Sequence, residues 1–363
     1  MENVKVLQIG LSNYPGGVEN SIMNYFRHLG GRVHFDFICT EETMAYREEI
    51  EGTGSTIFYL PSPKRHMYRF AKTLRSVIND GKYDIVHVNM LSAANIFPVI
   101  FSKGTYAKRV VAHAHNAGLP HGRIKKLAHH ILKHLIPLLT TEWMACSRDA
   151  AKWLFGKKHL PQVYILKNAI DYDRFCFSVT TRKKMRNMYD IADGTPVIGH
   201  VGRFGEEKNQ MFLIDLFARI KQKYPHARLL LVGTGPLLER VKQHAMDMGV
   251  ADHTIFVGEV NDAAPYYQMM DVFCMPSTFE GLGIVAVEAQ IAGLPCICST
   301  GVPREAIFTA GARRIDLSEM PIWVDSVENA LKEERSATVH QDMDCAGYNI
   351  AIEAKKLEGY YLK

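Results

Sequence analysis

Several signals that would assign a function class directly are missing from this sequence of 363 residues. Its seven cysteines are scattered and include no CxxC pair, so they predict buried, reduced thiols rather than a disulfide framework. No stretch approaches the roughly 18 uninterrupted apolar residues of a spanning helix. The first residues, MENVKVLQIG, lack the basic and long apolar regions of a signal peptide. These absences favour a cytoplasmic protein that does not cross a membrane.

The usual sequence motifs of phosphate, dinucleotide and zinc sites are also absent. "NYPGGVEN" lacks the Lys-Ser/Thr end of a P-loop, and in "VGTGPL" Leu238 stands where a dinucleotide motif has its third glycine. His130 and His134 have i, i+4 spacing without the glutamate of HExxH, and we interpret both as surface residues. We therefore expect neither a bound metal nor another cofactor.

Positive charge is concentrated in one part of the chain, whose formal net charge is +5. Between Phe101 and Ile170, twelve Lys and Arg residues stand against two acids, and seven of the sixteen histidines lie there. Such a region can meet nucleic acid, acidic lipid or an anionic small substrate. Nucleic acid is not expected, because aromatic residues are not interleaved with these charges.

Short apolar runs alternate with longer mixed segments, which predicts parallel sheets with helices on both faces. One series of strand-like runs precedes a polar stretch near residues 172–194, and a second series follows it. The first contains "VKVLQIG", "FDFIC", "TIFYL", "DIVHVN", "RVVAHAH", "MACS" and "VYILKN", and the second "PVIGHVG", "RLLLVG", "TIFVG", "DVFCMPS" and "PCICS". The pattern predicts an α/β protein of two doubly wound domains. We place them at residues 1–172 and 195–342, with a linker region at 173–194 and a helical end at about 343–363.

A basic segment of the first domain, "GRIKKLAHHILKHLIPLLTTEW", can form an amphipathic helix. Its apolar residues gather broadly on one side and its basic residues elsewhere: Ile124, Leu127, Ile131, Leu132 and Leu135 against Lys125, Lys126, His129 and Lys133. Such a helix suits the interface of an anionic membrane. An equal alternative is a basic surface helix whose apolar side packs on the sheet.

Residues that follow the strands deserve weight, because ligands of open α/β sheets bind beyond the carboxyl ends of the strands. Glycines, cations and carboxylates are concentrated there in both halves. In the first half they are Gly16, Gly17, Glu19, His113, His115, Asn116 and Asn168, and in the second Gly202, Arg203, Lys208, Gly233, Gly235 and Glu280 to Gly283.

Two glutamates flank a glycine turn in "FEGLGIVAVEAQIAG". Gly281 and Gly283 would expose amides at the start of the following helix, where unpaired N–H groups and the helix dipole attract a diphosphate. Glu280 could accept hydrogen bonds from hydroxyls of the same ligand, and Glu288 could reach a second polyol. The alternative is that Glu280 caps the helix and Glu288 is solvated. The apolar neighbours of Glu288 argue against that alternative, because an acid among them needs a partner.

Two cations follow another strand in "GHVGRFGEEKNQ". The planar fork of Arg203 and the point charge of Lys208 suit two adjacent phosphates. The alternative is that both are surface cations that form weak pairs with Glu206 and Glu207. In "HAHN", His113 and His115 lie on one side of an extended segment, where a histidine could hydrogen-bond a sugar. No third ligand is evident for a metal at this pair.

The motifs "GGVE", "HAHN", "LKNAIDYDRF", "GRFGEEKN", "VGTGP" and "FEGLGIVAVEA" occur in this order and spacing. In this combination the chain resembles the retaining, nucleotide-sugar-dependent glycosyltransferases of family 4 with the GT-B fold, from about residue 4 to 310. "RVVAHAHNAG" and "ACSRDAAKWLFG" are most similar to the branch that makes bacterial capsular and exopolysaccharides. The resemblance implies two Rossmann-like domains facing a cleft, with the donor mostly on the second domain and the C-terminal helix crossing back to the first.

Carried over by matching motif, the resemblance implies a role for each candidate. Arg203 and Lys208 would hold the diphosphate, Glu280 and the amides of Gly281, Leu282 and Gly283 the donor sugar, and Glu288 the ribose. Gly233, Gly235 and Pro236 would border the base, Gly16 and Gly17 would face the phosphates, and His115 the sugar. Asn168, His113, Asn116 and Glu19 are further candidates.

The implied activity is retaining transfer of a sugar from a UDP- or GDP-sugar to a glycan or lipid-linked glycan in cell-surface polysaccharide synthesis. The resemblance implies no divalent metal, because protein cations can stabilise the leaving group. The expected location is the cytoplasm, including the inner face of the plasma membrane. Two alternatives stay open: a sugar-nucleotide epimerase of similar architecture, and a non-catalytic partner subunit.

Overall fold

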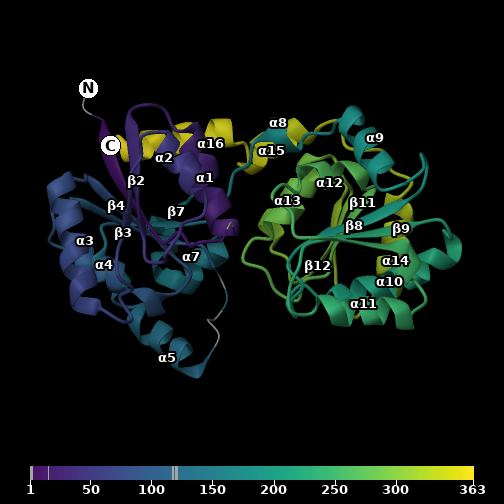
Figure 1. Ribbon diagram of the computed structural model, residues 1–363, viewed down its shortest axis with the longest axis horizontal. Helices are drawn as coiled ribbons and strands as arrows, with labels where there is room; N and C mark the ends of the chain where they lie inside the picture. The colour runs from purple at the N-terminus through teal and green to yellow at the C-terminus, as the bar shows by residue number, and fades with distance from the viewer. Residues whose placement is uncertain (1–2, 15, 117, 119–121) are drawn as a thin grey trace. The chain divides into compact units, whose positions relative to one another are not determined.

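The computed structural model describes residues 3–14, 16–116, 118 and 122–363. The chain divides into two compact units (Figure 1). Unit 1 combines residues 1–170 with 349–363, and unit 2 comprises residues 171–348. Residues 173–194, expected as a separate linker region, instead belong to unit 2, where they contribute the helices α8 and α9. The helical end differs as well, because a break divides it into α15 in unit 2 and α16 in unit 1.

Unit 1 contains a parallel sheet of seven strands in the order β3-β2-β1-β4-β5-β6-β7. The strand bounds are β1 (Val4–Ile9), β2 (Val33–Cys39), β3 (Ile57–Tyr59), β4 (Ile85–Met90), β5 (Arg109–Ala114), β6 (Glu142–Ala145) and β7 (Tyr164–Ile165). The helices are α1 (Gly17–His28), α2 (Arg47–Gly52), α3 (Met67–Gly81), α4 (Phe97–Ser102), α5 (Arg123–Leu132), α6 (Ile136–Leu139), α7 (Arg148–Phe155) and α16 (Ile350–Tyr361), with short 3₁₀ helices η1 (Ala93–Asn95) and η2 (Lys157–Gln162).

Unit 2 contains a parallel sheet of six strands in the order β10-β9-β8-β11-β12-β13. The strand bounds are β8 (Val197–Val201), β9 (Arg228–Val232), β10 (Thr254–Gly258), β11 (Val272–Met275), β12 (Cys296–Ser299) and β13 (Ala312–Ile315). The helices are α8 (Tyr172–Phe175), α9 (Val179–Met188), α10 (Gln210–Lys223), α11 (Leu238–Asp247), α12 (Ala264–Met269), α13 (Ile284–Ile291), α14 (Met320–Ala330) and α15 (Val339–Ala346), with η3 (Ala251–His253) and η4 (Arg304–Ala306).

Both sheets have the strand order of a doubly wound Rossmann fold, so the predicted fold class is confirmed. The order reverses between β1 and β4 in unit 1 and between β8 and β11 in unit 2. Loops leave these neighbouring strands toward opposite faces of the sheet, which opens a crevice at their carboxyl ends. The residues after β1, β4, β8 and β11 are therefore the positions where a ligand is expected.

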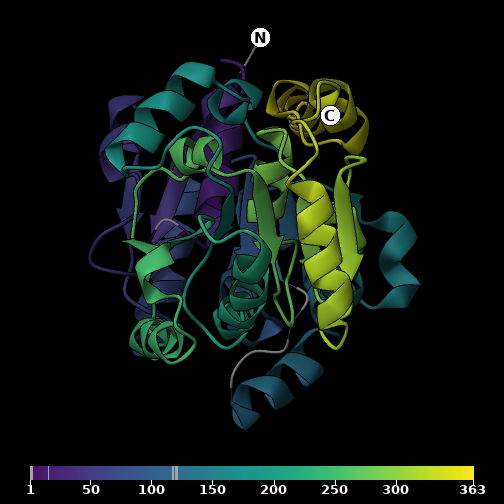
Figure 2. The same cartoon turned by 90° about the vertical axis from the view of Figure 1, so that its right-hand side faces the viewer.

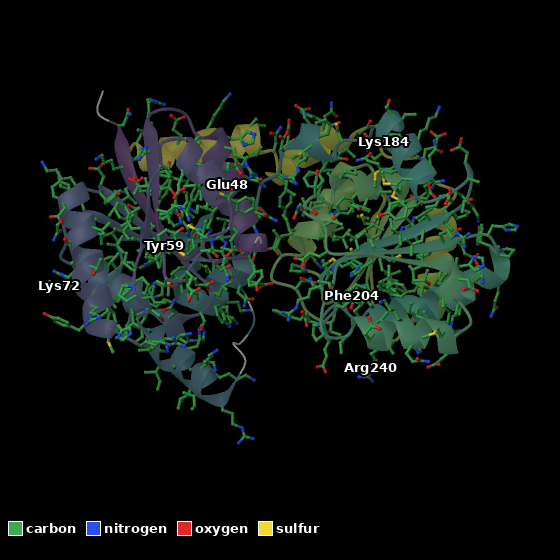
Figure 3. The ribbon with its side chains drawn as sticks, in the orientation of Figure 1. Glu48, Tyr59, Lys72, Lys184, Phe204 and Arg240 are labelled. Atoms are coloured by element: carbon green, nitrogen blue, oxygen red, sulfur yellow. The ribbon has the colours of Figure 1, made fainter. Side chains whose placement is uncertain are left out.

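Each sheet is buried on both faces, as parallel sheets require. In unit 1, α3, α4, α6 and α7 pack on one face and α1, α2 and α16 on the other. In unit 2, α10, α11 and α14 cover one face, and α12 and α13 lie on the other (Figure 1). Figure 3 shows the result for single side chains: Phe204 lies inside unit 2, whereas Lys72, Lys184 and Arg240 point outward from their helices.

Candidate active site

The loops after β8 and β11, the two strands at the switch point of unit 2, bring a cation and a carboxylate together. Lys208 lies in the turn before α10, and its Nζ is 2.6 Å from Oε1 of Glu280 in the loop after β11. The two side chains are 18% and 11% exposed. Because the ion pair is largely removed from water, salt screens it much less than a surface pair.

Glycines of the neighbouring turn allow the loop after β8 to pack closely against it. Phe204 N donates to Thr234 O at 2.9 Å, which joins the two turns. A Cβ at Gly233, whose φ is +131°, would lie 2.2 Å from Gly202 O, and one at Gly235 would lie 2.4 Å from Phe204 O. Gly233 and Gly235 therefore fix the position of the loop that carries Arg203 and Lys208.

Backbone hydrogen bonds and a closely packed glycine also fix the loop after β11. Thr278 N donates to Glu207 O at 2.8 Å, and Glu280 N donates to Gly301 O at 3.1 Å. Gly301 is required there, because a Cβ would lie 2.4 Å from Ser277 O. These contacts hold the backbone of Glu280 beside the turn that carries Lys208.

The turn between Glu280 and α13 presents backbone amides at a helix start. Gly283 has a left-handed conformation, with φ at 80°, and precedes the first residue of α13. Among the described residues, no acceptor receives a hydrogen bond from the N–H groups of Gly281, Leu282 or Gly283. Free amides at the positive end of a helix dipole favour an anion.

Glu288, in the middle of α13, has the partner that its apolar surroundings require. The Tyr267 hydroxyl donates to Glu288 Oε2 at 2.7 Å. Burial raises the pKa of Glu288 to about 7, and the Tyr267 hydrogen bond and Arg174 oppose that shift. The alternative of a solvated helix-face residue is wrong, because Glu288 is partly buried and hydrogen-bonded.

Arg203 and Pro236 are exposed, in the turns after β8 and β9. Buried side chains hold the backbone of Arg203: Gln210 Nε2 donates to Arg203 O at 2.9 Å and lies 3.4 Å from His200 Nε2. Sequence reasoning missed His200 and Gln210. The signal was present in "GHVG", where a histidine stands inside a buried parallel strand.

In unit 1, Glu19 shapes the glycine turn that follows β1. Its Oε1 accepts from Ser12 N at 3.0 Å and Ser12 Oγ at 2.8 Å, and its Oε2 accepts from Gly16 N at 3.2 Å. The side chain is 7% exposed. Glu19 therefore holds the turn, while Gly17 is exposed at the start of α1.

His113 and His115 of the same unit lie side by side, their ring centroids 3.9 Å apart. Both are buried. His115 Nε2 is 2.8 Å from Asn89 Oδ1, and His113 Nδ1 is 3.0 Å from His87 Nε2. Burial lowers the pKa of both rings, that of His115 to about 3, so both are neutral near pH 7. They can exchange hydrogen bonds with a neutral polar group.

The two candidate asparagines of unit 1 serve different local structures. Asn168, after β7, is 8% exposed, and its Oδ1 accepts from Ser21 Oγ of α1 at 3.1 Å. Asn116 Oδ1 accepts from Gly118 N at 3.0 Å. Asn168 thus joins the end of the sheet to the helix that begins with Gly17.

The basic helix α5 exposes its apolar side, so the alternative in which that side packs on the sheet is wrong. Leu132 contacts the core, but the others are 40–85% exposed: Ile124, Leu127, Ile131 and Leu135. The helix projects from unit 1 in Figures 1 and 2. His130 and His134 are exposed, as predicted.

His129 was expected among the basic residues outside the apolar side of α5, but it is fully buried. Its Nδ1 accepts from Ala93 N at 3.2 Å, and its ring stacks on Trp153 with centroids 4.0 Å apart. His129 is therefore the inward-facing anchor of α5, and only the lysines and Arg123 form its basic side.

Metal-ligand groups and membrane-spanning helices are both absent from the described residues. No group of three or more His, Cys, Asp or Glu side chains is placed to hold a metal ion. No helix in the described part of the chain combines the length and apolar character needed to cross a bilayer.

Comparisons with known proteins agree with this architecture. Residues 181–317 match the family model of glycosyl transferases group 1, and residues 15–174 match that of glycosyltransferase family 4. EpsF of Bacillus subtilis strain 168, which is named as a glycosyltransferase, is 31% identical over 339 residues, covering 90% of this chain and 87% of that protein.

Two more distant proteins are similar over most of their length. A UDP-Gal:alpha-D-GlcNAc-diphosphoundecaprenol alpha-1,3-galactosyltransferase of Escherichia coli is 24% identical, covering 82% of this chain and 79% of that one. The crystal structure of Anabaena HepE in complex with UDP has the same fold, with a TM-score of 0.82, 18% identity, and coverage of 98% of this chain and 99% of that one. The chain therefore belongs to the family 4 glycosyltransferases of GT-B fold, and it is an enzyme of sugar transfer.

Proposed function

We propose that the enzyme moves a sugar, with retention of configuration, from a nucleotide-sugar to a lipid-linked glycan in cell-surface polysaccharide synthesis. The observation that carries the proposal is the pairing of Lys208 with Glu280 at the switch point of unit 2, beside the free amides at the start of α13. A cation and amides there suit a diphosphate, and a carboxylate suits the hydroxyls of a sugar.

In this proposal Arg203, Lys208 and the amides of Gly281–Gly283 stabilise the negative charge that develops on the diphosphate when the anomeric C–O bond breaks. The acceptor oxygen bonds to the anomeric carbon on the face that the phosphate leaves, and its proton passes to the departing phosphate. Glu280 positions the sugar through hydrogen bonds to its hydroxyls and forms no covalent bond to it. Glu288 accepts hydrogen bonds from the ribose, and the turn of Gly233, Gly235 and Pro236 borders the base.

Unit 1 holds the acceptor in this proposal and contributes the amides of Gly16 and Gly17 and the ring of His115 to donor recognition. No divalent metal is needed, since protein cations neutralise the leaving group. The relatives support a nucleotide donor and an acceptor on a lipid: Anabaena HepE was crystallised with UDP and with UDP-glucose, and the E. coli relative is named for UDP-Gal and a diphosphoundecaprenol acceptor.

Unit 1 also carries the feature that would meet a membrane. The exposed apolar residues of α5 and its basic side suit the headgroup region of an anionic bilayer, where Lys and Arg are attracted to acidic lipid. We propose that α5 lies on the inner face of the plasma membrane, where lipid-linked acceptors are presented.

The deciding experiment offers UDP- and GDP-sugars together with a lipid-linked glycan and identifies the products by mass spectrometry. A lengthened glycan supports the proposal, and NMR of the isolated product should show that the new linkage keeps the anomeric configuration of the donor. Hydrolysis or interconversion of the donor without an acceptor would indicate an epimerase. Absence of both donor binding and turnover would indicate a non-catalytic partner subunit.

A further inference from the structure

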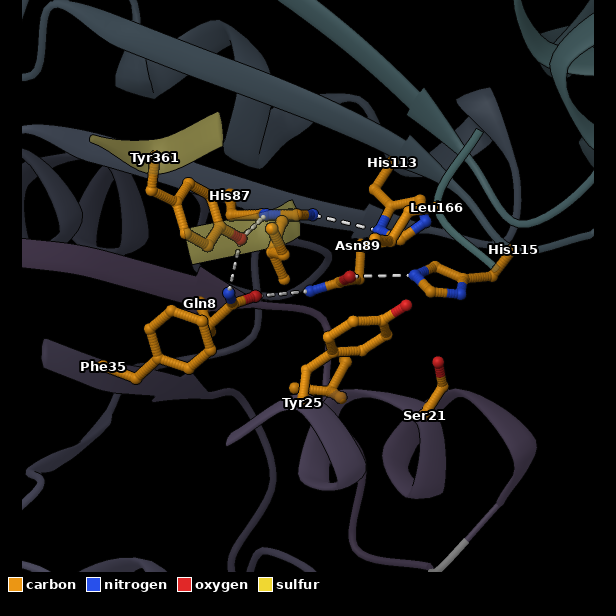
Figure 4. A pocket seen from close by; sticks show the side chains of 12 residues that line it. Gln8, Ser21, Tyr25, Phe35, His87, Asn89, His113, His115, Leu166 and Tyr361 are labelled. Atoms are coloured by element: carbon orange, nitrogen blue, oxygen red, sulfur yellow. Dashed lines mark hydrogen bonds between the residues drawn. The ribbon is translucent and has the colours of Figure 1, made fainter. Parts of the chain in front are cut away.

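Unit 1 contains a buried hydrogen-bonded network of which the proposed transfer uses only one end, His115. It comprises six side chains: Gln8 of β1, His87 and Asn89 of β4, His113 of β5, His115 after β5, and Tyr361 of α16 (Figure 4). All six are 2–9% exposed. They line a cavity of about 20 Å³, enough for about one water molecule.

The sequence builds this network by alternation within parallel strands. His87 and Asn89 are two residues apart in β4, so their side chains lie on the same face of the sheet. The register pairs Gln8 with His87 and Asn89 with His113, which aligns these polar residues across three strands. Helix α16 covers this face and brings Tyr361 onto it.

One branch of the network determines which nitrogen of His113 carries the proton. The Tyr361 hydroxyl lies 2.6 Å from His87 Nδ1, and Gln8 Nε2 can donate to the same hydroxyl at 3.5 Å. The hydroxyl hydrogen is thus directed to His87 Nδ1, which leaves the proton of His87 on Nε2. That proton is donated to His113 Nδ1 at 3.0 Å. His113 is therefore protonated on Nε2.

The other branch determines the tautomer of His115. The amide nitrogen of Asn89 donates to Ile9 O at 3.1 Å and to Gln8 Oε1 at 3.0 Å. The amide oxygen of Asn89 must then accept, and it receives the proton on His115 Nε2 at 2.8 Å. His115 Nδ1 is left with a bare lone pair.

Within this network, two buried nitrogens have no partner among the described residues, His113 Nε2 and His115 Nδ1. One is a donor and the other an acceptor, and they belong to neighbouring rings whose centroids are 3.9 Å apart. In Figure 4 both nitrogens point away from the hydrogen-bonded chain. Leaving a buried polar atom unpaired costs stability, so such atoms usually meet a ligand or water.

We propose that His113 Nε2–H and His115 Nδ1 together bind one hydroxyl group of the sugar substrate, and that Tyr361 and His87 are positioning residues that set the tautomer of His113. The hydroxyl accepts from His113 and donates to His115, so the pair matches a group that is donor and acceptor at once. The assignment of a sugar as the ligand rests on the proposed function, whereas the assignment of the tautomers rests only on the hydrogen bonds.

The test is ¹⁵N NMR of the full chain labelled at histidine, in which long-range ¹H–¹⁵N correlations identify the protonated nitrogen of each ring. In the wild type we expect His87, His113 and His115 to be protonated on Nε2. Tyr361→Phe should give His87 and His113 mixed tautomers and leave His115 unchanged. Transfer by this variant should fall about tenfold in kcat/KM, the effect of one neutral hydrogen bond. Tyr360→Phe, one residue away, is the matched control and should change neither the tautomers nor the turnover.

Further outcomes separate this inference from the proposed function. Protonation of His113 on Nδ1 in the wild type, or unchanged tautomers in a folded Tyr361→Phe, would overturn the inference. His113→Gln, which keeps an N–H donor near the Nε2 position, should retain more activity than His113→Leu, and equal losses would also count against it. A wild type that transfers no sugar but has the expected tautomers would instead overturn the proposed function.

Discussion

Lys208 of the loop after β8 and Glu280 of the loop after β11 form an ion pair at 2.6 Å across the switch point of unit 2. In the proposed function a donor diphosphate competes with Glu280 for this lysine. The carboxylate is then available to the sugar, so the two residues act as a unit whose single substitutions are not additive.

Lys208→Ala and Glu280→Ala should each lower kcat/KM by about two orders of magnitude or more, because each removes a charge at the reacting centre. Circular dichroism should remain that of the parent. Lys223→Ala is the control, since Lys223 pairs with Glu328 on the surface at 58% exposure and should leave turnover unchanged. Near-parental turnover by folded Lys208→Ala would remove the leaving-group assignment.

Glu288 should make the stability of unit 2 depend on pH. Its pKa is raised by burial from 4.5 to about 7, so the folded state holds a proton between these values that the unfolded state releases. The free energy of unfolding should therefore fall as the pH rises from about 4.5 to about 7. In Glu288→Gln this fall should be absent when the free energy of unfolding is measured by denaturant titration at the two pH values. Glu239→Gln, at an exposed position, should preserve it. If the free energy of unfolding of Glu288→Gln fell with pH as steeply as that of the parent, Glu288 would not be the source of this pH dependence.

Gly233→Ala should destabilise the protein by roughly 3 kcal/mol or more, because it combines backbone strain with a collision. The new Cβ would lie 2.2 Å from Gly202 O at a φ of +131°. Gly249→Ala isolates the backbone contribution, since Gly249 has φ at +68° and open space around it, and it should cost roughly 1 kcal/mol. If thermal unfolding showed the same loss of stability for Gly233→Ala and Gly249→Ala, the contact between the two turns would be unimportant.

Helix α5 should bind vesicles that contain acidic lipid in a flotation assay without detergent. Lys125→Glu with Lys126→Glu should weaken binding more than about tenfold, because each lysine near such a surface contributes about 1 kcal/mol. Lys157→Glu with Lys158→Glu changes the net charge equally at exposed positions of η2 and should bind nearly as the parent does. Recovery of all wild-type protein in the bottom fraction would exclude the membrane proposal.

The strands were the most predictable part of the fold, because buried parallel strands are short, continuous apolar runs bounded by turns. β13 was missed, since two of the four residues in "ARRI" are arginines and the run has no apolar pattern. The separate linker was wrong because polar helices resemble loops in composition. In α9 the arginines are polar by sequence, yet Arg186 is 1% exposed and bonds Asp271 at 2.7 Å.

The candidate site was predictable where its residues follow strands and belong to motifs. Lys208 and Glu280 are 72 residues apart, but the strand order makes β8 and β11 neighbours. Tyr361 could not be found in this way, because it lies 274 residues from His87 and follows no strand. The outward orientation of α5 was equally hidden, since it depends on His129 stacking on Trp153.

Unit 1 is discontinuous in the chain, and this has a consequence for how the enzyme is made. The sheet face that holds His87 and His113 is covered by α16, whose residues leave the ribosome only after all of unit 2. During synthesis unit 2 can complete its core first, while the part of the histidine-bearing face that α16 covers stays open to solvent. Completion of the histidine network is thereby tied to translation of α16.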